Sequence, residues 1–358
     1  MEKESSDLTV AIVTDANSSI GMGHAVRCGA IASSLKKIGI SVFFIVSDKE
    51  SLQKMAQLGH PVLSLNSEYK SIAAEGKKII ALLKEHSAGF VFFDSYFASD
   101  SLFETVSVQC PVGCFGYGKN YKSGMSLIVP YGVSSDAQWY RENFSPEKTA
   151  VLFGSDYVPL RESFGNDFRT RGNAVPKNLL LTCGATDPLG IIPALINSIR
   201  TRDLGITIHA VIGQFFDIEE LSGLSLDTDG VVLHEGVSDL SSVMSDADIA
   251  VSAGGMTLYE LMASGVPTVA FSMADNQLGN SRLDGAVLWC GDIRRGGALD
   301  PSKVSMITDK VSFLIKDAAK RAELIQAGRN MCDGRGADRI AESIYVIMKR
   351  HSIQCWSL

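Results

Sequence analysis

The side chains best suited to chemistry are grouped in loops that directly follow short apolar runs. The first loop begins at Asp15, contains Gly21 and Gly23, and leads into a helical pattern carrying His24 and Arg27. Glycines let a backbone approach a ligand closely. The positive end of the helix disfavours an imidazolium, so a neutral His24 is able to accept a proton near pH 7. We predict that His24 is catalytic and that the other four residues contact substrate; the alternative is a structural histidine on a tight turn.

The loop at residues 252–260 has the pattern of a phosphate site. It follows an expected strand, contains a glycine pair and leads into the start of a helix. Gly254 and Gly255 precede Met256 and Thr257, where unpaired N–H groups and the helix dipole stabilise negative charge. Glu260 lies about one turn further, within reach of ribose hydroxyls. The sequence predicts that these five residues bind a pyrophosphate and its ribose. A packed α/β turn is the structural alternative.

Two more loops offer hydrogen-bonding side chains for a sugar or a water. Tyr96 follows an apolar run that ends at Asp94, and its phenol can orient a sugar hydroxyl or a water molecule. Asn276 and Gln277 can donate and accept hydrogen bonds to phosphate or sugar. For Asp94 we expect a helix cap.

The loop from Gly184 to Pro188 allows two interpretations. Free backbone N–H groups there would hold an anion, which makes Gly184 a substrate-binding candidate. Helix capping by Thr186 or Asp187, with Pro188 at the first helical position, explains the same residues equally well.

Two cofactor interpretations fit less well. Asp48 lies at the spacing of a ribose-binding acid after the first glycine loop, but Val26 stands where a dinucleotide fingerprint has its third glycine. Asp227 and Asp229 match a short metal-binding pattern of some glycosyltransferases, yet Asp229 before Gly230 is typical of a turn. We therefore expect neither a metal nor a bound cofactor.

Composition restricts the class of partner. The 358 residues carry a net charge of −7, which gives no general attraction for nucleic acid or an anionic membrane surface. With 46% hydrophobic and 20% charged residues, the chain is that of a folded protein. The acidic N-terminus and the lack of an apolar run of about 18 residues favour a cytoplasmic protein without a membrane span. The seven cysteines, an odd number in mostly apolar segments, favour buried thiols over disulfides.

The elements that must position these loops alternate between β-branched runs and helical patterns, which predicts an α/β fold of parallel sheets covered by helices. A polar stretch at 164–177 marks a linker between two Rossmann-like domains, 1–165 and 166–345, followed by a tail at 346–358. Expected strands lie at 8–14, 41–46, 90–93, 112–115, 127–130, 178–182, 206–212, 231–233, 249–252 and 268–271, and expected helices at 23–38, 71–85, 189–199, 240–244, 257–263, 302–315, 318–329 and 337–348. We expect the last helix to pack back on the first domain.

Four motifs occur together with the late glycine turn: GMGHAVRC at 21–28, DSY at 94–96, GSDYVPLR at 154–161 and ADNQ at 274–277. In this combination the chain, from about Ala11 to Ala341, resembles the UDP-sugar hydrolases of pseudaminic acid biosynthesis. These enzymes cleave UDP-2,4-diacetamido-2,4,6-trideoxy-β-L-altropyranose, and spore-coat polysaccharide proteins are related to them. One segment departs from the family pattern, because FGYGK at 115–119 stands where an acidic pair is expected.

The resemblance implies the glycosyltransferase-B architecture, with two Rossmann-like domains facing each other across a cleft that holds a nucleotide-sugar. The enzyme that adds N-acetylglucosamine to the lipid-linked peptidoglycan precursor has a similar architecture. By motif, His24 corresponds to the catalytic histidine, Tyr96 to an active-site tyrosine, Glu260 to the ribose-binding acid and Asn276 to an asparagine near the sugar. The family resemblance further implies inversion at the anomeric carbon.

The sequence therefore predicts a metal-independent hydrolase that uses water to cleave a UDP-linked diacetamido-trideoxy sugar, giving UDP and free sugar for nonulosonic (pseudaminic) acid or surface polysaccharide synthesis. His24 would act as base or water anchor, while Tyr96 and Asn276 position sugar and water. Two alternatives are a UDP-sugar transferase that uses an acceptor hydroxyl, and a non-catalytic protein that only binds a nucleotide-sugar.

Overall fold

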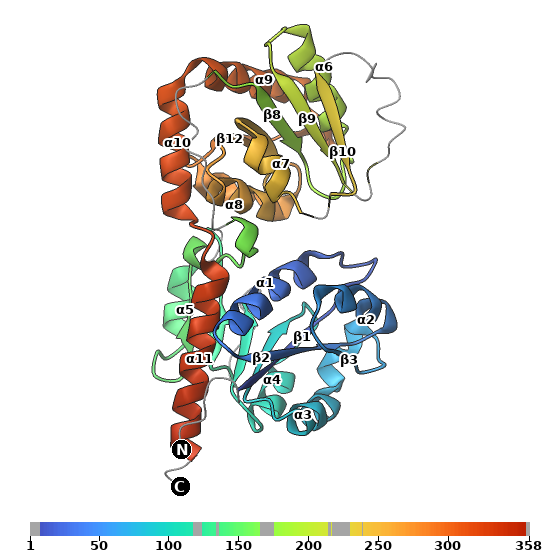
Figure 1. Ribbon diagram of the computed structural model, residues 1–358, viewed down its shortest axis with the longest axis vertical. Coiled ribbons are helices and arrows are strands. Elements are labelled where there is room, and N and C mark those ends of the chain that lie inside the picture. Colours follow the sequence, from blue (N-terminus) through green and yellow to red (C-terminus); the bar gives the residue numbers. More distant parts are fainter. Residues whose placement is uncertain are drawn as a thin grey trace. The chain divides into compact units, whose positions relative to one another are not determined.

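The chain folds into two compact units, each built on one parallel β-sheet (Figure 1). Unit 1 comprises Met1–Glu162 and Arg335–Leu358, and unit 2 comprises Ser163–Gly334. The structure is a computed structural model, and it describes residues 8–116, 124–133, 136–164, 175–213, 216, 230–237 and 239–355. The expected turn at 227–229, most of the expected linker and residues 117–119 of the FGYGK segment lie outside these residues.

The sheet of unit 1 has the strand order β3-β2-β1-β4-β5-β6-β7, with parallel neighbours throughout. The strands are β1 (Thr9–Thr14), β2 (Ser41–Val46), β3 (Val62–Ser64), β4 (Phe90–Asp94), β5 (Val112–Phe115), β6 (Leu127–Val129) and β7 (Ala150–Val151). Strand order reverses between β1 and β4. The loops that leave the carboxyl ends of these two strands therefore border the crevice where open α/β sheets bind ligands.

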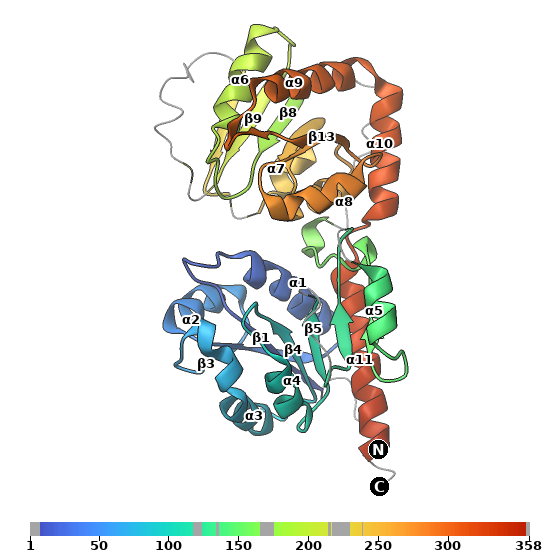
Figure 2. The same ribbon diagram turned by 180° about the vertical axis from the view of Figure 1, so that it is seen from behind.

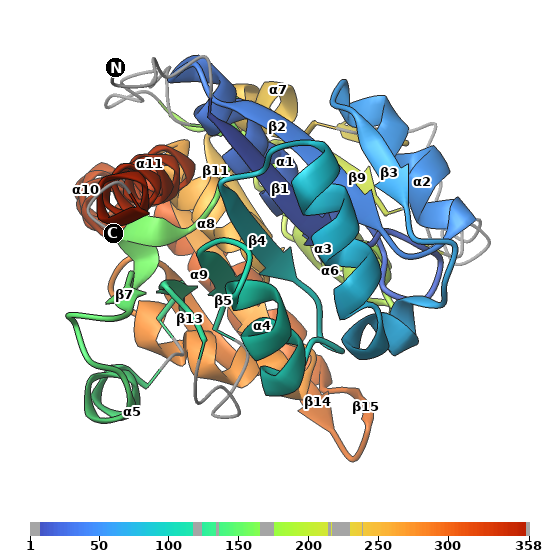
Figure 3. The ribbon, with the colours of Figure 1, turned by 90° about the horizontal axis from the view of Figure 1, so that it is seen from below.

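Helices cover both faces of this sheet (Figure 3). They are α1 (Gly23–Lys37), α2 (Lys49–Met55), α3 (Gly76–Glu85), α4 (Asp100–Ser107), α5 (Ala137–Asn143) and α11 (Gly336–Cys355), with short 3₁₀ helices η2 (Ala56–Leu58), η3 (Tyr69–Ala74), η4 (Ser155–Tyr157) and η5 (Glu162–Phe164). Alternate residues of a strand point to opposite faces. Val10 and Ile12 accordingly pack with α1 and α11, whereas Ala11 and Val13 pack with α3 and α4.

The last helix, α11, belongs to unit 1, as the sequence predicts. Its apolar positions Ile340, Ile344 and Met348 are buried in the same cluster as the inner face of α1. At the start of the helix, Ser34 donates a hydrogen bond to Asp338 at 2.7 Å. Unit 2 therefore ends at Gly334 and not at residue 345, and no separate tail begins at 346, because α11 is one continuous helix. No helix in the described ranges is long and apolar enough to cross a membrane.

Unit 2 has the strand order β10-β9-β8-β11-β12-β13, again all parallel, which is the order of the Rossmann fold. Its elements are β8 (Asn178–Thr182), α6 (Ile191–Thr201), β9 (Thr207–Ile212), β10 (Val231–Glu235), α7 (Ser241–Asp246), β11 (Ile249–Ala253), α8 (Met256–Ala263), β12 (Thr268–Ser272), η7 (Asp275–Leu283), β13 (Leu288–Asp292), the hairpin β14 (Arg294–Arg295) and β15 (Ala298–Leu299), α9 (Pro301–Lys316) and α10 (Ala318–Met331). Helices α6 and α9 cover one face and α7 and α8 the other (Figure 2).

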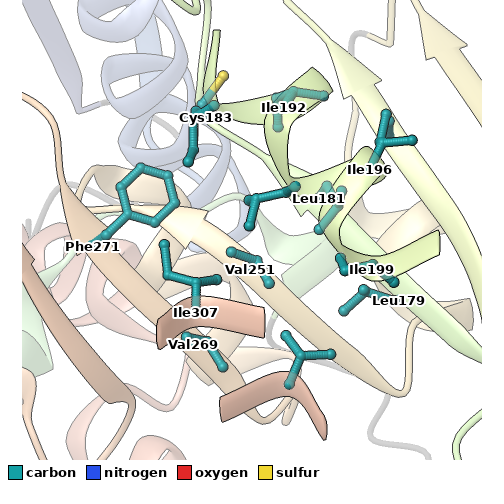
Figure 4. Packing of buried hydrophobic residues seen from close by; sticks show 14 of the residues in the cluster. Leu179, Leu181, Cys183, Ile192, Ile196, Ile199, Val251, Val269, Phe271 and Ile307 are labelled. Atoms are coloured by element: carbon teal, nitrogen blue, oxygen red, sulfur yellow. The ribbon is translucent and has the colours of Figure 1, made fainter. Parts of the chain in front are cut away.

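The core of unit 2 shows why these sequences form strands and helices. Leu181, Val251 and Val269 come from three neighbouring strands, and Ile196 of α6 and Ile307 of α9 pack on them (Figure 4). All five side chains are almost fully buried. Within one strand every second residue points to the same face, and within one helix every third or fourth residue does. This periodicity is the pattern from which strands and helices are predicted.

Several short elements differ from the sequence prediction. β3 and β7 have three and two residues, too few for a recognisable alternation, and β13 was also not expected. The helix expected at 71–85 is divided into η3 and α3 at Gly76. A Cβ atom at Gly76 would lie 3.1 Å from the side chain of Thr105, so the glycine permits close packing of α3 on α4.

The packing of α11 predicts that residues at the very end of the chain stabilise unit 1. Replacing the fully buried Ile344 by alanine should lower the free energy of unfolding of unit 1 by about 2–5 kcal/mol, measured by urea denaturation. Val346, on the exposed side of the same helix, is the control, and Val346→Ala should change that free energy by less than about 0.5 kcal/mol. Equal effects of the two substitutions would contradict the packing of α11.

Candidate functional site

The loop between β1 and α1 is held by hydrogen bonds that bring His24 to the edge of the sheet. Asp15 accepts hydrogen bonds from Ser47, at 2.6 Å from the backbone and 2.8 Å from the hydroxyl. Burial raises the pKa of Asp15, although these hydrogen bonds oppose the shift. Gly21 donates to the carbonyl of Asn17 at 2.8 Å and has φ +71°, a conformation that favours glycine. Asp15 and Gly21 are thus part of the loop's own support.

His24, Arg27 and Asp94 form a buried cluster in unit 1. α1 carries His24 and Arg27 one turn apart, and Asp94 is the last residue of β4, the strand beside β1. Arg27 donates from Nε to Oδ2 of Asp94 at 2.6 Å and from Nη2 to Oδ1 at 2.7 Å. Nδ1 of His24 lies 2.8 Å from the same Oδ1. The cationic Arg27 and the imidazole of His24 therefore share the carboxylate of Asp94.

The contacts of Nδ1 decide which ring nitrogen of neutral His24 carries the proton. Nδ1 faces two acceptors of Asp94, Oδ1 at 2.8 Å and the main-chain oxygen at 3.2 Å. If Nδ1 were unprotonated, its lone pair would face the lone pairs of the carboxylate and the two would repel each other. Nδ1 is therefore the hydrogen-bond donor. Nη2 of Arg27 lies 3.0 Å from Nδ1 because both groups converge on Oδ1. The lone pair of the neutral ring is then on Nε2, which can accept a proton.

Asp94 stays ionised although it is enclosed. Burial by itself would raise the pKa of this carboxyl, but the charge of Arg27, with hydrogen bonds from His24 and Arg27, holds the pKa well below its usual range. The carboxylate is therefore a lasting acceptor for the Nδ1 proton. Asp94 is not a helix cap, contrary to the expectation from sequence, since Ser99 caps α4 by accepting from Leu102 at 3.3 Å.

Tyr96 and a small cavity lie beside the imidazole. The rings of Tyr96 and His24 meet edge to face, with centroids 4.7 Å apart and an interplanar angle of 86°. The cavity measures about 10 Å³, close to the space of a single water molecule. It is lined by Asp15, Ile20, His24, Tyr69, Asp94, Ser95, Tyr96 and Phe97. Ile20 and Phe97 are apolar, and most of the surface that the lining residues expose to this space is apolar.

In unit 2, α8 follows the glycine turn after β11. Gly255 is the N-cap of α8, which begins at Met256, and no side-chain hydrogen bond caps the helix. The N–H of Gly255 donates to the carbonyl of Ala253 at 2.8 Å, and that of Gly254 donates to the carbonyl of Phe271 at 2.7 Å. A Cβ atom at Gly255 would meet nothing within 4 Å, whereas one at Gly254 would lie 3.2 Å from Gln277, Phe271 and Trp289, so close packing favours glycine at 254. Gly255 has extended backbone angles that any residue adopts, so the fold of this unit does not require glycine there.

The polar loop after β12 supports this turn. Asn280, a residue that the sequence analysis did not single out, donates to the carbonyl of Gly254 at 2.9 Å. The side-chain oxygen of Gln277 accepts from the backbone of Met273 at 2.9 Å, so this amide serves the loop itself. Asn276 is exposed at the start of η7.

Thr257 and Glu260 both lie on α8. Thr257 follows Met256 in the first turn and is half-buried, and Glu260 is buried one turn further along the helix.

The loop around Gly184 supports the capping interpretation. Asp187 accepts from the backbone of Ile191 at 2.9 Å and of Ile192 at 2.8 Å, so its carboxylate occupies the N-terminus of α6. Pro188 is not the first helical residue, because α6 begins at Ile191. Gly184 itself is exposed, with φ +99°.

The groups weighed as cofactor ligands have structural partners where they are described. Asp48 caps α2 by accepting from Ser51 at 2.7 Å, and it also accepts from Asn17 at 3.2 Å. Within the described part of the chain, no three His, Cys, Asp or Glu side chains are grouped so as to hold a metal ion.

Unit 1 thus brings together Asp15, His24, Arg27 and Tyr96 of the predicted residues, and unit 2 brings together Gly254 and Gln277. Sequence reasoning missed Asn280 in unit 2 and the role of Asp94 in unit 1. For Asp94 a signal was present in the sequence. Its position at the end of a buried strand was the available signal, since strand ends at the point of reversed strand order border the ligand crevice.

Comparison with known proteins gives distant relatives. No family model matches the chain. The spore coat polysaccharide biosynthesis protein SpsG of Bacillus subtilis is 22% identical over 351 residues, which cover 92% of this chain and 96% of SpsG. The uncharacterized protein MJ1062 of Methanocaldococcus jannaschii is 25% identical over 275 residues, or 73% of this chain. The aligned region spans only about half of that relative, 55% of its length.

Solved structures establish the fold. MurG of Acinetobacter baumannii is 14% identical, with a TM-score of 0.65, covering 94% of this chain and 99% of that structure. A UDP-GlcNAc 2-epimerase of Neisseria meningitidis, solved bound to UDP-GlcNAc, is 13% identical, with a TM-score of 0.67 and coverage of 94% and 100%. The glycotransferase of kitacinnamycin has 14% identity, a TM-score of 0.65 and coverage of 95% and 99%. The chain shares with these enzymes the two Rossmann-like domains of the glycosyltransferase-B fold.

The buried ion pair predicts a stability effect that depends on pH. Asp94→Asn leaves Arg27 buried without a counter-charge and should lower the free energy of unfolding by about 3–5 kcal/mol at neutral pH. Because the pKa of Asp94 is lowered in the folded state, its contribution is present above the ordinary value of 3.8 and is lost as the pH falls below it. The free energies of unfolding of the wild-type and Asp94→Asn proteins should be measured by urea denaturation at a series of pH values. The difference between them should be constant near neutral pH and become smaller in acid.

The exposed Asp156 provides the control for this substitution. Asp156→Asn should change the free energy of unfolding by less than about 0.5 kcal/mol at any of these pH values. A similarly small effect of Asp94→Asn would contradict the ion pair.

Proposed function

We propose that this protein is an enzyme of polysaccharide or nonulosonic (pseudaminic) acid biosynthesis that hydrolyses a UDP-linked diacetamido-trideoxy sugar. Similarity to SpsG supports the pathway, and the shared fold with enzymes whose names refer to UDP-sugars supports the substrate class. The sequence motifs that resemble the UDP-sugar hydrolases support the sugar and the reaction.

The observation that carries the proposal is the pairing of His24 with Asp94. Asp94 keeps the proton of the neutral imidazole on Nδ1, so Nε2 acts as the base. In the proposed reaction, Nε2 takes a proton from water as the water oxygen bonds to the anomeric carbon. The bond between that carbon and the UDP oxygen breaks, and its electron pair leaves with UDP. Tyr96, beside the ring, orients water or sugar.

We assign the leaving nucleotide to the glycine turn of unit 2. The start of α8 at Met256 and Thr257 has no side-chain cap, and it offers N–H groups and the positive end of the helix dipole to the diphosphate. Asn280 and Gln277 fix this turn and the loop beside it before the ligand binds, so less ordering is needed on binding. In this proposal, Glu260 contacts the ribose, Asn276 contacts the sugar, and Gly23 and Gly184 line the substrate.

Transfer of the sugar to an acceptor hydroxyl is the second candidate, and the fold shared with MurG and the kitacinnamycin glycotransferase favours it. The same base would serve both reactions. The cavity beside His24, with space for about one water, supports water as the nucleophile.

Nucleotide release provides the test of function. With a UDP-linked diacetamido-trideoxy sugar and no acceptor, the protein should release UDP and free sugar, also in the presence of a chelator. His24→Gln should reduce turnover by about 10²–10⁴-fold, the usual contribution of a positioned base, while the affinity for UDP stays the same. His86, an exposed histidine of the same unit, is the control, and His86→Gln should leave turnover unchanged.

Two other outcomes of this assay would change the assignment. UDP release that appears only when an acceptor is added would indicate a transferase. Full turnover of His24→Gln would remove His24 from the mechanism.

The phosphate assignment predicts a separation between binding and stability at Gly255. Gly255→Ala adds a methyl group in open space at the start of α8, so the stability of the free protein should be nearly unchanged. The affinity for UDP, measured by calorimetry, should fall at least about tenfold, a loss of about 1.4 kcal/mol.

Val346→Ala, on the exposed side of α11, is the control and should keep the affinity for UDP. Unchanged UDP affinity in Gly255→Ala would place the diphosphate elsewhere.

A further inference from the structure

Arg27 connects the His24 imidazole to three strands of unit 1. Besides its two hydrogen bonds to Asp94 of β4, Arg27 donates from Nη1 to the hydroxyl of Tyr131, after β6, at 3.2 Å. Its Cζ atom lies 5.1 Å from the ring centroid of Phe115, the last residue of β5, a distance at which cation and ring attract. The sequence predicts a substrate contact for Arg27. The structure surrounds its side chain with protein groups and leaves the residue 8% exposed.

We propose that Arg27 is a positioning residue that holds the carboxylate of Asp94 in place, and thereby holds neutral His24 with its proton on Nδ1 and its lone pair on Nε2. The inference rests on the proposed function of His24 as the base. It gives Arg27 a role inside the protein in place of the expected substrate contact.

The geometry of the cluster gives the physical reason. The carboxylate of Asp94 is buried, and a buried charge is costly unless donors reach it directly. Arg27 donates to both of its oxygens, and Nδ1 of His24 lies against the oxygen Oδ1 that Arg27 also holds. Removing Arg27 should therefore loosen the carboxylate and weaken the contact that keeps the His24 proton on Nδ1.

The shape of the arginine side chain matters as well as its charge. Two parallel N–H donors fix both oxygens of Asp94, which a lysine ammonium cannot do in the same way. Tyr131 holds the third nitrogen of the guanidinium, and burial raises the pKa of this phenol to about 12, so it remains neutral at ordinary pH. A lysine in place of Arg27 should preserve the charge balance and lose the orientation.

Other titratable groups face the same space. Cys28 donates to Oδ2 of Asp94 at 3.3 Å, and burial raises the pKa of its thiol well above the usual value. Asp15, Tyr69 and Tyr96 line the cavity beside His24, and burial also raises the pKa of Asp15. Because Asp15 can titrate on the acid side of the pH profile, a measurement specific to the His24 ring is needed.

Nitrogen NMR of the full chain, labelled with ¹⁵N in its six histidines, provides that measurement. The His24 signals are identified by their loss in His24→Gln. In the free protein at neutral pH, Nδ1 should show the shift of a protonated nitrogen and Nε2 that of an unprotonated one. In Arg27→Met this difference between the two nitrogens should be reduced or lost. Arg27→Lys should reduce it less.

Kinetics provide a second readout. Turnover of Arg27→Met at neutral pH should fall about 10- to 100-fold, part of the contribution of the base, with KM within about twofold of the wild-type value.

A folded Arg27→Met protein with unchanged ¹⁵N shifts of His24 would overturn the proposal. If Arg27→Met does not fold, Tyr131→Phe and Arg27→Lys are measured instead, and wild-type ¹⁵N shifts of His24 in both variants would also overturn it. If the His24 signals change as expected in Arg27→Met but His24→Gln still releases UDP at the full rate, the proposed function fails and the inference about Arg27 stands.

Discussion

One buried carboxylate that has to remain charged sets the arrangement of unit 1. Asp94 is enclosed at the end of β4, and the cost of removing its charge from water is offset only by donors that reach it directly. Arg27 and His24 supply these donors, and both depend on the start of α1 at Gly23. The contact between Arg27 and Asp94 therefore depends both on the conformation of the loop before α1 and on the pairing of β1 with β4.

The two units prepare for polar ligands in different ways. In unit 1 the polar groups are side chains, bonded to one another in a closed cluster beneath Tyr96. In unit 2 the polar groups at the glycine turn are mainly backbone amides, and side chains such as Asn280 act by holding the backbone. A side-chain cluster can move a proton, whereas fixed amides can only stabilise charge. For this reason we propose that unit 1 supplies the base and that unit 2 binds the leaving group.

Sequence patterns predicted the class of fold, the main strands of both sheets and the three closing helices. They missed β3 and β7, whose three and two residues carry no period, and also the longer elements β13, α2, α4 and α5. At the site, glycine loops and His24 were visible as local patterns. The role of Asp94 was not, because an aspartate after a strand has the same local pattern whether it caps a helix or meets an arginine 67 positions away. Only the pairing of β1 with β4 distinguishes the two.

The return of α11 to unit 1 affects the order in which the protein can fold during synthesis. Unit 2 is one uninterrupted stretch of chain, so the ribosome makes all of its strands and helices before it makes α11. The face of the unit 1 sheet that α11 covers stays incomplete until α11 has been made. The unit whose first strand is made earliest can therefore complete its fold only after the whole of unit 2 has been made, the reverse of the usual order from the N-terminus.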